Sequence, residues 1–533
     1  MPRLRPSIAW FLAFTAAFAA FAGYVFWGTW SPDVVPVMPD CWTSYPATFL
    51  SDHLRSFYEG GRFVPDDLKV FLGGPWVWQE LQFAFALYFA ALGVVYYCRG
   101  RGLSRPASYC AALLLAFSGY WMTLYSAGHL GWFRWMTYGV FAFGLADRAV
   151  RVGKPRHGLL LGAVVSWAGF NQQDLWLLFT VFTAAYFVWC CVRERKFLWN
   201  GMLVAGAVFA LIGVPNFVST LEGALKGRKD QIERGENVTS SGASDEEKRW
   251  EFVTNWSLPP DETAEFLVPR VNGDTSCPFV LSINRSKGVR PYTGALGRPM
   301  NAPRGNYRQH SLYVGWATCL FALVGLVSLL FRRPRGDTVF FAVAAAVFCL
   351  LSFGRYFAPA YRVVFALPFG DLIRCPVKWH HLVELSLVFL AAFGMDAVLR
   401  AFAPLRNRPK LAIAVVCGMV LVGVCGLAAN AHLYCAPVDM TAARRGGYKA
   451  DMAVLARADF AKPQVAAMVR AGRIVSLASY MGSPDYFLVS VLKDFEPRKP
   501  VSPTVFTLLF GAVSMLTTLG VAGFSIRSVA RRQ

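Results

Sequence analysis

The sequence has few charged residues, since Asp, Glu, Lys and Arg make up 16% of its 533 positions. Soluble domains contain about 25%. Hydrophobic residues account for 55% of the chain, and the mean hydropathy is +0.40. This composition excludes a cytosolic enzyme and a secreted disulfide scaffold, and it predicts a polytopic membrane protein.

Apolar runs recur at nearly the length that crosses a bilayer core, roughly 20 residues. We predict twelve transmembrane helices, which places both termini on the same side of the membrane. The fourth run contains Arg134, and the fifth is short. The runs cover residues 8–27, 81–98, 106–125, 132–146, 158–171, 175–192, 197–220, 311–331, 338–354, 380–399, 411–430 and 501–526.

Acidic residues are scarce, with 32 Asp and Glu against 53 Lys and Arg, a net charge of +21. In a soluble chain this excess would indicate nucleic acid binding. The predicted cytoplasmic segments, however, hold 22 basic and three acidic residues, and therefore +19 of the +21. The excess follows the positive-inside rule, so we expect no nucleic acid partner. The segments are residues 1–7, 99–105, 147–157, 193–199, 332–337, 400–410 and 527–533.

Two further patterns, a framework of paired cysteines and a nucleotide-binding loop, are not found in the sequence. Most of the 12 Cys lie inside predicted spans, and no pairing is favoured among the four predicted external ones, Cys41, Cys277, Cys375 and Cys435. The predicted cytoplasmic segments contain no Gly-rich nucleotide-binding loop, which argues against a nucleotide-sugar donor or an ATP-driven mechanism.

Four predicted external segments are long: residues 28–80, 221–310, 355–379 and 431–500. The second mixes charges around residues 245–249, and we expect a solvated segment with little regular structure there. In the first, residues 47–58 carry apolar side chains at helical spacing, which predicts an interfacial helix.

The last external segment contains two β-like runs, residues 473–480 and 486–492, which predict a small hairpin. The expected fold is thus all-α, with a transmembrane domain in residues 1–430, a small mixed external segment in residues 431–500, and a final transmembrane helix with a basic cytoplasmic tail in residues 501–533.

Ionisable groups at the membrane edge are often functional. We predict that several line a cavity open to the outside. The short turn before the sixth span is also consistent with simple helix capping by Asp174 and its Gln neighbours. The predicted cavity residues are His129, Arg134, Gln173, Asp174, His380 and Glu384.

Asp40 lies just before the predicted interfacial helix of the first external segment. A carboxylate there can accept a proton from a sugar hydroxyl or ligate a divalent cation. The alternative is that Asp40 caps the helix. Asp52, within the helix, is better explained as a solvated side chain.

Residues 355–379 are the most informative segment. Arg355, Arg362, Arg374 and Lys378 stand there against the single acid Asp371, a net charge of +3 on the predicted outer side. These cations suit an anionic headgroup, because Arg can bind phosphate oxygens bidentately. General attachment to lipid phosphates is the alternative. The interleaved Pro and aromatic residues favour a specific site.

The order of several motifs resembles that of YfhO-like bacterial membrane proteins, whose architecture is that of GT-C glycosyltransferases. In residues 354–379, the Ile-Arg-Cys-Pro-Val-Lys core resembles their Arg-x-Pro-x-Arg region. Further matches are the Asp40 segment, residues 256–260 (Trp-Ser-Leu-Pro-Pro), residues 267–273 and the stretch ending at Asp396. The resemblance covers most of residues 1–430.

The resemblance implies an enzyme of the bacterial inner membrane that transfers sugar from a polyprenyl-phosphate carrier to an envelope glycan, lipid or protein. Asp40 would be the catalytic base, and Arg374 and Lys378, with Arg355 and Arg362, would bind the carrier phosphate. A lipid or solute transporter and a noncatalytic envelope assembly factor are the alternatives. We find no half-to-half repeat of the kind many transporters show.

Overall fold

The computed structural model describes nine longer stretches of the chain and three short strands, with a few isolated positions between them. The described stretches are residues 6–25, 34–37, 68–116, 130–168, 173–196, 199–215, 244–267, 312–331, 336–367, 373–402, 476–479 and 487–490.

The described part is predominantly helical, and three of its helices are long and apolar enough to cross a membrane. Their apolar stretches are Phe83–Gly100, Leu175–Glu194 and Pro376–Ala401. A fourth candidate is the pair Gly336–Ser352 and Gly354–Ala366, which is bent by 109°. These helices support an integral membrane protein of helical type.

Each of the first ten predicted spans overlaps an observed helix, and the eleventh and twelfth lie outside the described residues. The helices are α1 (Pro6–Val25), α3 (Leu68–Gly100), α4 (Arg105–Ala116), α6 (Leu130–Val152), α7 (Pro155–Ala168), α8 (Gln173–Glu194), α9 (Trp199–Val208) with the π-helical turn η2 (Phe209–Gly213), α13 (Trp316–Phe331), α14 (Gly336–Ser352) and α16 (His380–Phe402). Several are shorter than a bilayer crossing requires.

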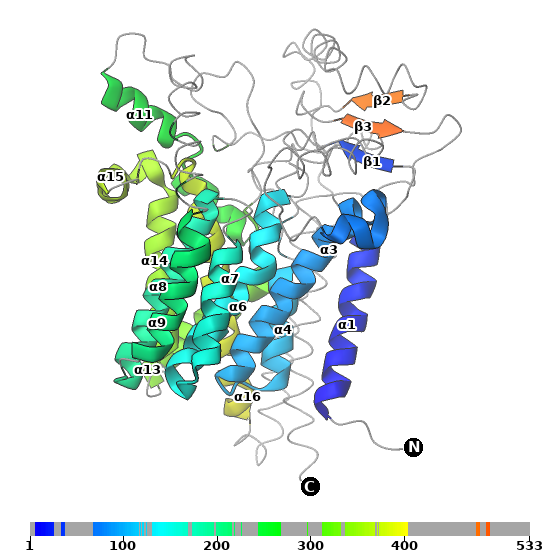
Figure 1. Cartoon of the computed structure of the whole chain (residues 1–533), viewed down its shortest axis with the longest axis vertical. Coiled ribbons are helices and arrows are strands. Elements are labelled where there is room, and N and C mark those ends of the chain that lie inside the picture. Colours follow the sequence, from blue (N-terminus) through cyan, green and yellow to red (C-terminus); the bar gives the residue numbers. More distant parts are fainter. Residues whose placement is uncertain are drawn as a thin grey trace.

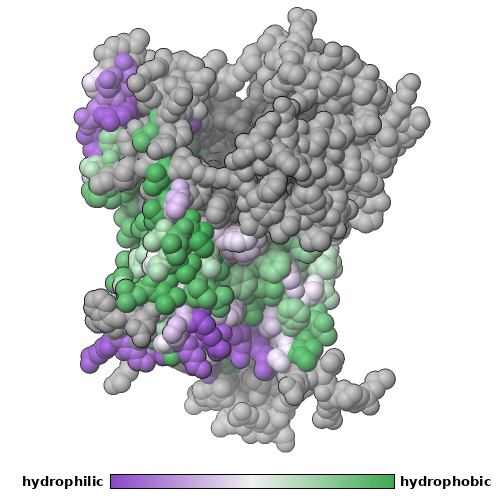
Figure 2. Space-filling view, in the orientation of Figure 1, coloured by the Kyte–Doolittle hydropathy of each residue, from purple (hydrophilic) through white to green (hydrophobic). Residues whose placement is uncertain are grey.

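The helices run alternately up and down in one bundle (Figure 1). The described links 101–104, 153–154 and 195–196 therefore lie at the same end, which we call the basic end. Figure 2 shows hydrophilic side chains gathered at that end and hydrophobic ones over the middle of the visible face. We call the opposite end, where α14 finishes, the far end.

The helix α3 begins at Leu68, before the predicted second span, and its apolar stretch Phe83–Gly100 agrees with that span. One sequence-based expectation was wrong. Around residues 245–249 we expected little regular structure, yet α11 (Asp245–Val253) forms there. Ser244 and Glu247 close a capping box at its start, and these hydrogen bonds lower the pKa of the exposed Glu247.

The far end also carries short elements and a small sheet. The 3-10 turns η3 (Pro260–Phe266), η4 (Gly354–Phe357) and η6 (Pro376–Trp379) connect longer helices, and α15 (Ala358–Ala366) follows η4. The strands β2 (Ser476–Ser479) and β3 (Phe487–Ser490) lie within the two β-like runs and pair antiparallel. The strand β1 (Val34–Val37) from the first external segment adds to the other edge of β3, with Val35 opposite Val489.

The helix α16 is the centre of the described bundle. Within its apolar stretch 78% of the residues are buried, against 61% for α3 and 56% for α8. It packs tightly against α13, because a side chain at Gly325 would meet the Leu390 carbonyl oxygen at 2.6 Å. Small residues allow such close helix contacts within a membrane.

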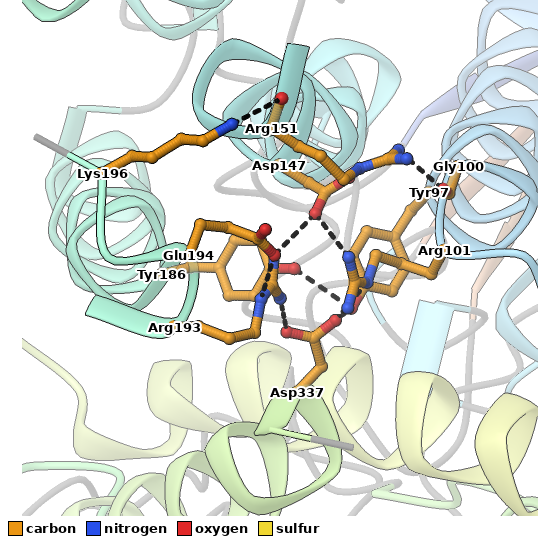
Figure 3. Close-up of polar contacts among 10 residues, drawn as sticks. All are labelled: Tyr97, Gly100, Arg101, Asp147, Arg151, Tyr186, Arg193, Glu194, Lys196 and Asp337. Atoms are coloured by element: carbon orange, nitrogen blue, oxygen red, sulfur yellow. Dashed lines mark hydrogen bonds and ion pairs between the residues drawn. The ribbon is translucent and has the colours of Figure 1, made fainter. Parts of the chain in front are cut away.

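At the basic end, two buried aspartates share two arginines (Figure 3). Asp147 of α6 accepts hydrogen bonds from Arg101 at 2.9 Å and from Arg193 of α8 at 2.8 Å. Asp337 of α14 forms ion pairs with the same two arginines. We call Arg101, Asp147, Arg193 and Asp337 the arginine–aspartate network.

Two tyrosines extend the network into the bundle. Tyr97 of α3 donates a hydrogen bond to Asp337 at 3.2 Å, and Tyr186 of α8 donates to Tyr97 at 3.2 Å. At the surface, Arg151 also pairs with Asp147 at 3.1 Å. The network thus joins α3, α6, α8 and α14 through charges that satisfy one another.

We expect Asp337→Ala to lower the free energy of unfolding by about 3–5 kcal/mol, because Arg101 and Arg193 would each lose a buried counter-charge. The midpoint of thermal unfolding in detergent measures this. Glu194→Gln is the matched control, since Glu194 pairs with the same Arg193 but is 27% exposed, and it should cost less than about 1 kcal/mol. Equal effects of the two changes would contradict a stabilising role for the buried network.

Candidate functional site

Two segments about 100 residues apart in the sequence meet at the far end. Backbone hydrogen bonds join Leu258 to Ser352 at 2.9 Å, Cys375 to Val253 at 3.1 Å, and Val377 to Trp256 at 3.1 Å. These contacts join the Trp-Ser-Leu-Pro-Pro element to the Arg-Cys-Pro-Val-Lys element, two motifs on which the family resemblance rests. We call residues 252–258, 352–355 and 374–377 the Gly354 junction.

Gly354 lies where Ser257 and Pro376 approach the backbone closely. Its φ of +50° is in the left-handed region, which L-residues with side chains disfavour. A Cβ atom there would collide with the Ser257 hydroxyl and lie 2.5 Å from Cγ of Pro376. The junction therefore requires glycine for two independent reasons.

Arg355 is part of the junction itself. Its backbone N–H donates to Ser257 Oγ at 3.0 Å, and its Nε donates to the Thr254 carbonyl oxygen at 3.0 Å. Its Nη2 donates to Asn255 Oδ1, also at 3.0 Å. The sequence predicted a phosphate ligand here, but most of this guanidinium is used to hold the two segments together.

Arg374 is the better placed cation. Its guanidinium carbon lies 4.4 Å from the centre of the Phe252 ring and 4.9 Å from that of Trp256, and the side chain is partly exposed. Cation–π contacts of this kind orient a guanidinium and leave its N–H groups available to an anion. Its Nε is buried and has no hydrogen-bond partner among the described residues.

The other two predicted phosphate ligands differ in environment. Lys378, in η6, is buried. Arg362, on α15, is exposed, and its guanidinium carbon lies 5.2 Å from the centre of the Trp250 ring of α11. The four predicted cations therefore share one region of the far end without forming a single exposed cluster.

Two of the predicted cavity residues lie inside the bundle at the start of α16. His380 and Glu384 are both fully buried, so neither lines an open cavity in this structure. The His380 ring lies 4.7 Å from the centre of the Tyr120 ring and 4.6 Å from that of Phe266. Glu384 Oε1 accepts a hydrogen bond from the Ser118 hydroxyl, while its Oε2 has no partner among the described residues.

The remaining predicted residues are only partly located. Arg134 lies in α6, and Gln173 and Asp174 begin α8, but their side chains are not described. The base candidate Asp40 and the cavity candidate His129 lie outside the described residues. Asp40 follows β1 by three positions.

Neither a metal ligand set nor a disulfide appears in the part of the chain that the structure describes. No three His, Cys, Asp or Glu side chains gather there in a way that could hold a metal ion. Cys375, one of the four predicted external cysteines, is buried and forms no disulfide bond with a described residue. The other three lie outside the described residues.

The sequence did not reveal the aromatic partners of the site. Phe252 and Trp256 flank Arg374, and Trp250 lies beneath Arg362, all from a segment expected to have little regular structure. The capping box at Ser244 and Glu247 was the available signal, because it marks a helix start that orients the following aromatic residues.

The arrangement combines a guanidinium held between aromatic rings with a buried carboxylate at the start of the central helix. It can bind an anion at the far end of the apolar bundle. No family model, curated protein or solved structure matches the chain.

We expect Gly354→Ala to lower the free energy of unfolding by about 2–4 kcal/mol, from backbone strain together with overpacking against Pro376. Thermal unfolding in detergent measures the change. Gly206→Ala in α9 is the control, because a Cβ there meets nothing within 4 Å and alanine favours the helix. If both variants unfold at the same temperature, the junction does not depend on this glycine.

Proposed function

We propose that this protein is a membrane glycosyltransferase of GT-C type, similar to YfhO-like bacterial proteins. It transfers a sugar from a polyprenyl-phosphate carrier to an envelope acceptor on the outer side of the membrane. The observation that carries the proposal is the position of Arg374, between Phe252 and Trp256 at the far end of an apolar bundle.

The carrier phosphate requires cations at the membrane edge, because charge develops on it as the glycosidic bond breaks. In the proposed site Arg374 binds this phosphate with Lys378 close by in sequence, and the apolar helices contact the polyprenyl tail. Arg355 contributes indirectly, since its hydrogen bonds to Thr254 and Asn255 hold the segment that carries the aromatic rings.

The acceptor hydroxyl attacks the anomeric carbon, and the carrier leaves as polyprenyl phosphate. Asp40 takes the hydroxyl proton as general base, an effect worth about 10²–10⁴ in rate. A divalent cation bound at this carboxylate would be an alternative way to activate the hydroxyl. The far end is then the outer side of a bacterial inner membrane, and the arginine–aspartate network lies on the cytoplasmic side.

Asp40→Asn should abolish transfer and leave insertion and folding intact, because the amide keeps the shape of the carboxylate but cannot accept the proton. Mass spectrometry of envelope glycans and of accumulated polyprenyl-phosphate sugar measures the outcome. Asp52→Asn, in the same external segment, is the matched control and should leave transfer unchanged. Normal glycans in a correctly inserted Asp40→Asn strain would refute the assignment.

Arg374→Ala should weaken binding of the carrier about 10- to 100-fold, the loss expected when a charged group no longer donates to a phosphate. Titration of the purified protein with polyprenyl phosphate measures the affinity. Arg156→Ala removes an exposed arginine from the basic end and should have no effect. Equal losses in the two variants would indicate nonspecific lipid contact instead of a carrier site.

A further inference from the structure

The helix α15 has a different orientation from the bundle helices. It follows α14 after the turn η4, with a bend of 109° between the two segments. If α14 crosses the bilayer, a bend close to a right angle places α15 nearly parallel to the membrane plane, at the depth where α14 ends. Figure 1 shows α15 seen nearly end-on beside the end of α14.

One side of α15 packs against the protein. Tyr361 is fully buried and donates a hydrogen bond to the Ile373 carbonyl oxygen at 2.8 Å. Trp250 of α11 packs against Phe365, with 5.3 Å between ring centres. These contacts fix the rotation of α15 about its own axis, so the residues on its other side are held outward.

The outward side of α15 presents exposed residues at helical spacing, i, i+3, i+4 and i+7, and the exposed C-cap residue Leu367 follows them. Val363 is 65% exposed and Leu367 56%, and Arg362 is the only charged residue on this side. An exposed apolar stripe of this kind signals an interaction surface. Its members are Pro359, Arg362, Val363, Ala366 and Leu367.

The helix α14, which leads into α15, also has exposed apolar residues. On α14, Val343, Val347 and Leu350 are exposed along the length of the helix, and Phe357, at the end of η4, is exposed as well. For an apolar helix of transmembrane type, the partner of such residues is the lipid bilayer. Because α15 follows α14 directly after η4, the same bilayer is the partner within reach of its exposed residues.

From this geometry we propose that α15 is an interfacial helix that binds the bilayer surface. Val363 and Leu367 enter the outer part of the acyl region, and Arg362 binds the phosphate of an anionic phospholipid. This inference does not depend on the glycosyltransferase proposal, because Arg362 and Arg374 contact different aromatic rings. It assigns Arg362 to a bilayer lipid and not to the sugar carrier.

The first experiment tests the depth of α15 in the full-length protein in nanodiscs of phosphatidylglycerol and phosphatidylcholine. Val363→p-benzoylphenylalanine should form a lipid adduct on illumination, detected by mass spectrometry. Glu246→p-benzoylphenylalanine, on the exposed side of α11, is the control and should form none. No lipid adduct at position 363, or a cross-link there to a second copy of the chain, would overturn the proposal.

The second experiment tests the headgroup. Arg362→Gln should reduce the affinity for phosphatidylglycerol about fivefold, the effect of one basic residue near an anionic surface, as measured by native mass spectrometry of retained lipid. Arg249→Gln removes an exposed arginine from α11 and should leave retention unchanged. Equal retention in wild type and Arg362→Gln would overturn the assignment of Arg362 to a lipid phosphate. If Arg362→Gln leaves carrier binding unchanged, the exposed surface of α15 is distinct from the proposed carrier site at Arg374.

Discussion

The described bundle depends on two buried carboxylates that share the same two guanidinium groups. Asp147 and Asp337 lie on α6 and α14, while Arg101 follows α3 and Arg193 lies near the end of α8. In an apolar environment each charge would be costly alone, so the four elements are most stable when all four charges meet. This constraint fixes the positions of the helices along their axes. Apolar contacts alone would allow the helices to slide past one another.

The central helix α16 connects this constraint to the far end. Near the basic end, Asp396 accepts a hydrogen bond from the Ser104 backbone N–H at 2.9 Å and pairs with Arg400 at 2.9 Å. At its other end α16 begins with His380 and Glu384, directly after the junction that carries Arg374. The proposed carrier site thus stands on a helix whose position is held at both ends, which suits a site that must keep a phosphate at a defined depth.

The sequence predicted the main helices well, because an apolar run of sufficient length has few alternatives in a membrane protein. It could not predict α11, whose polar first turn looks like a solvated loop until the capping box at Ser244 is considered. The roles of Arg355 and Arg374 were also not separable, because both are basic residues in one short segment. Only the contacts with residues 252–256 distinguish Arg355, which donates hydrogen bonds to Thr254 and Asn255, from Arg374, which packs against two aromatic rings. Asp147 and Asp337 are two of the three acidic residues in the predicted cytoplasmic segments, and the sequence does not indicate their partners because these lie on other helices.

The shared arginines also have a consequence for synthesis of the chain. Arg101, Asp147 and Arg193 are all made before Asp337, which is 144 residues beyond Arg193. Until Asp337 is synthesised, the network consists of two cations and one anion, and it carries a net positive charge. Insertion of α14 then supplies the missing carboxylate. The network is therefore neutral only after α14 has packed against the helices that carry Arg101 and Arg193.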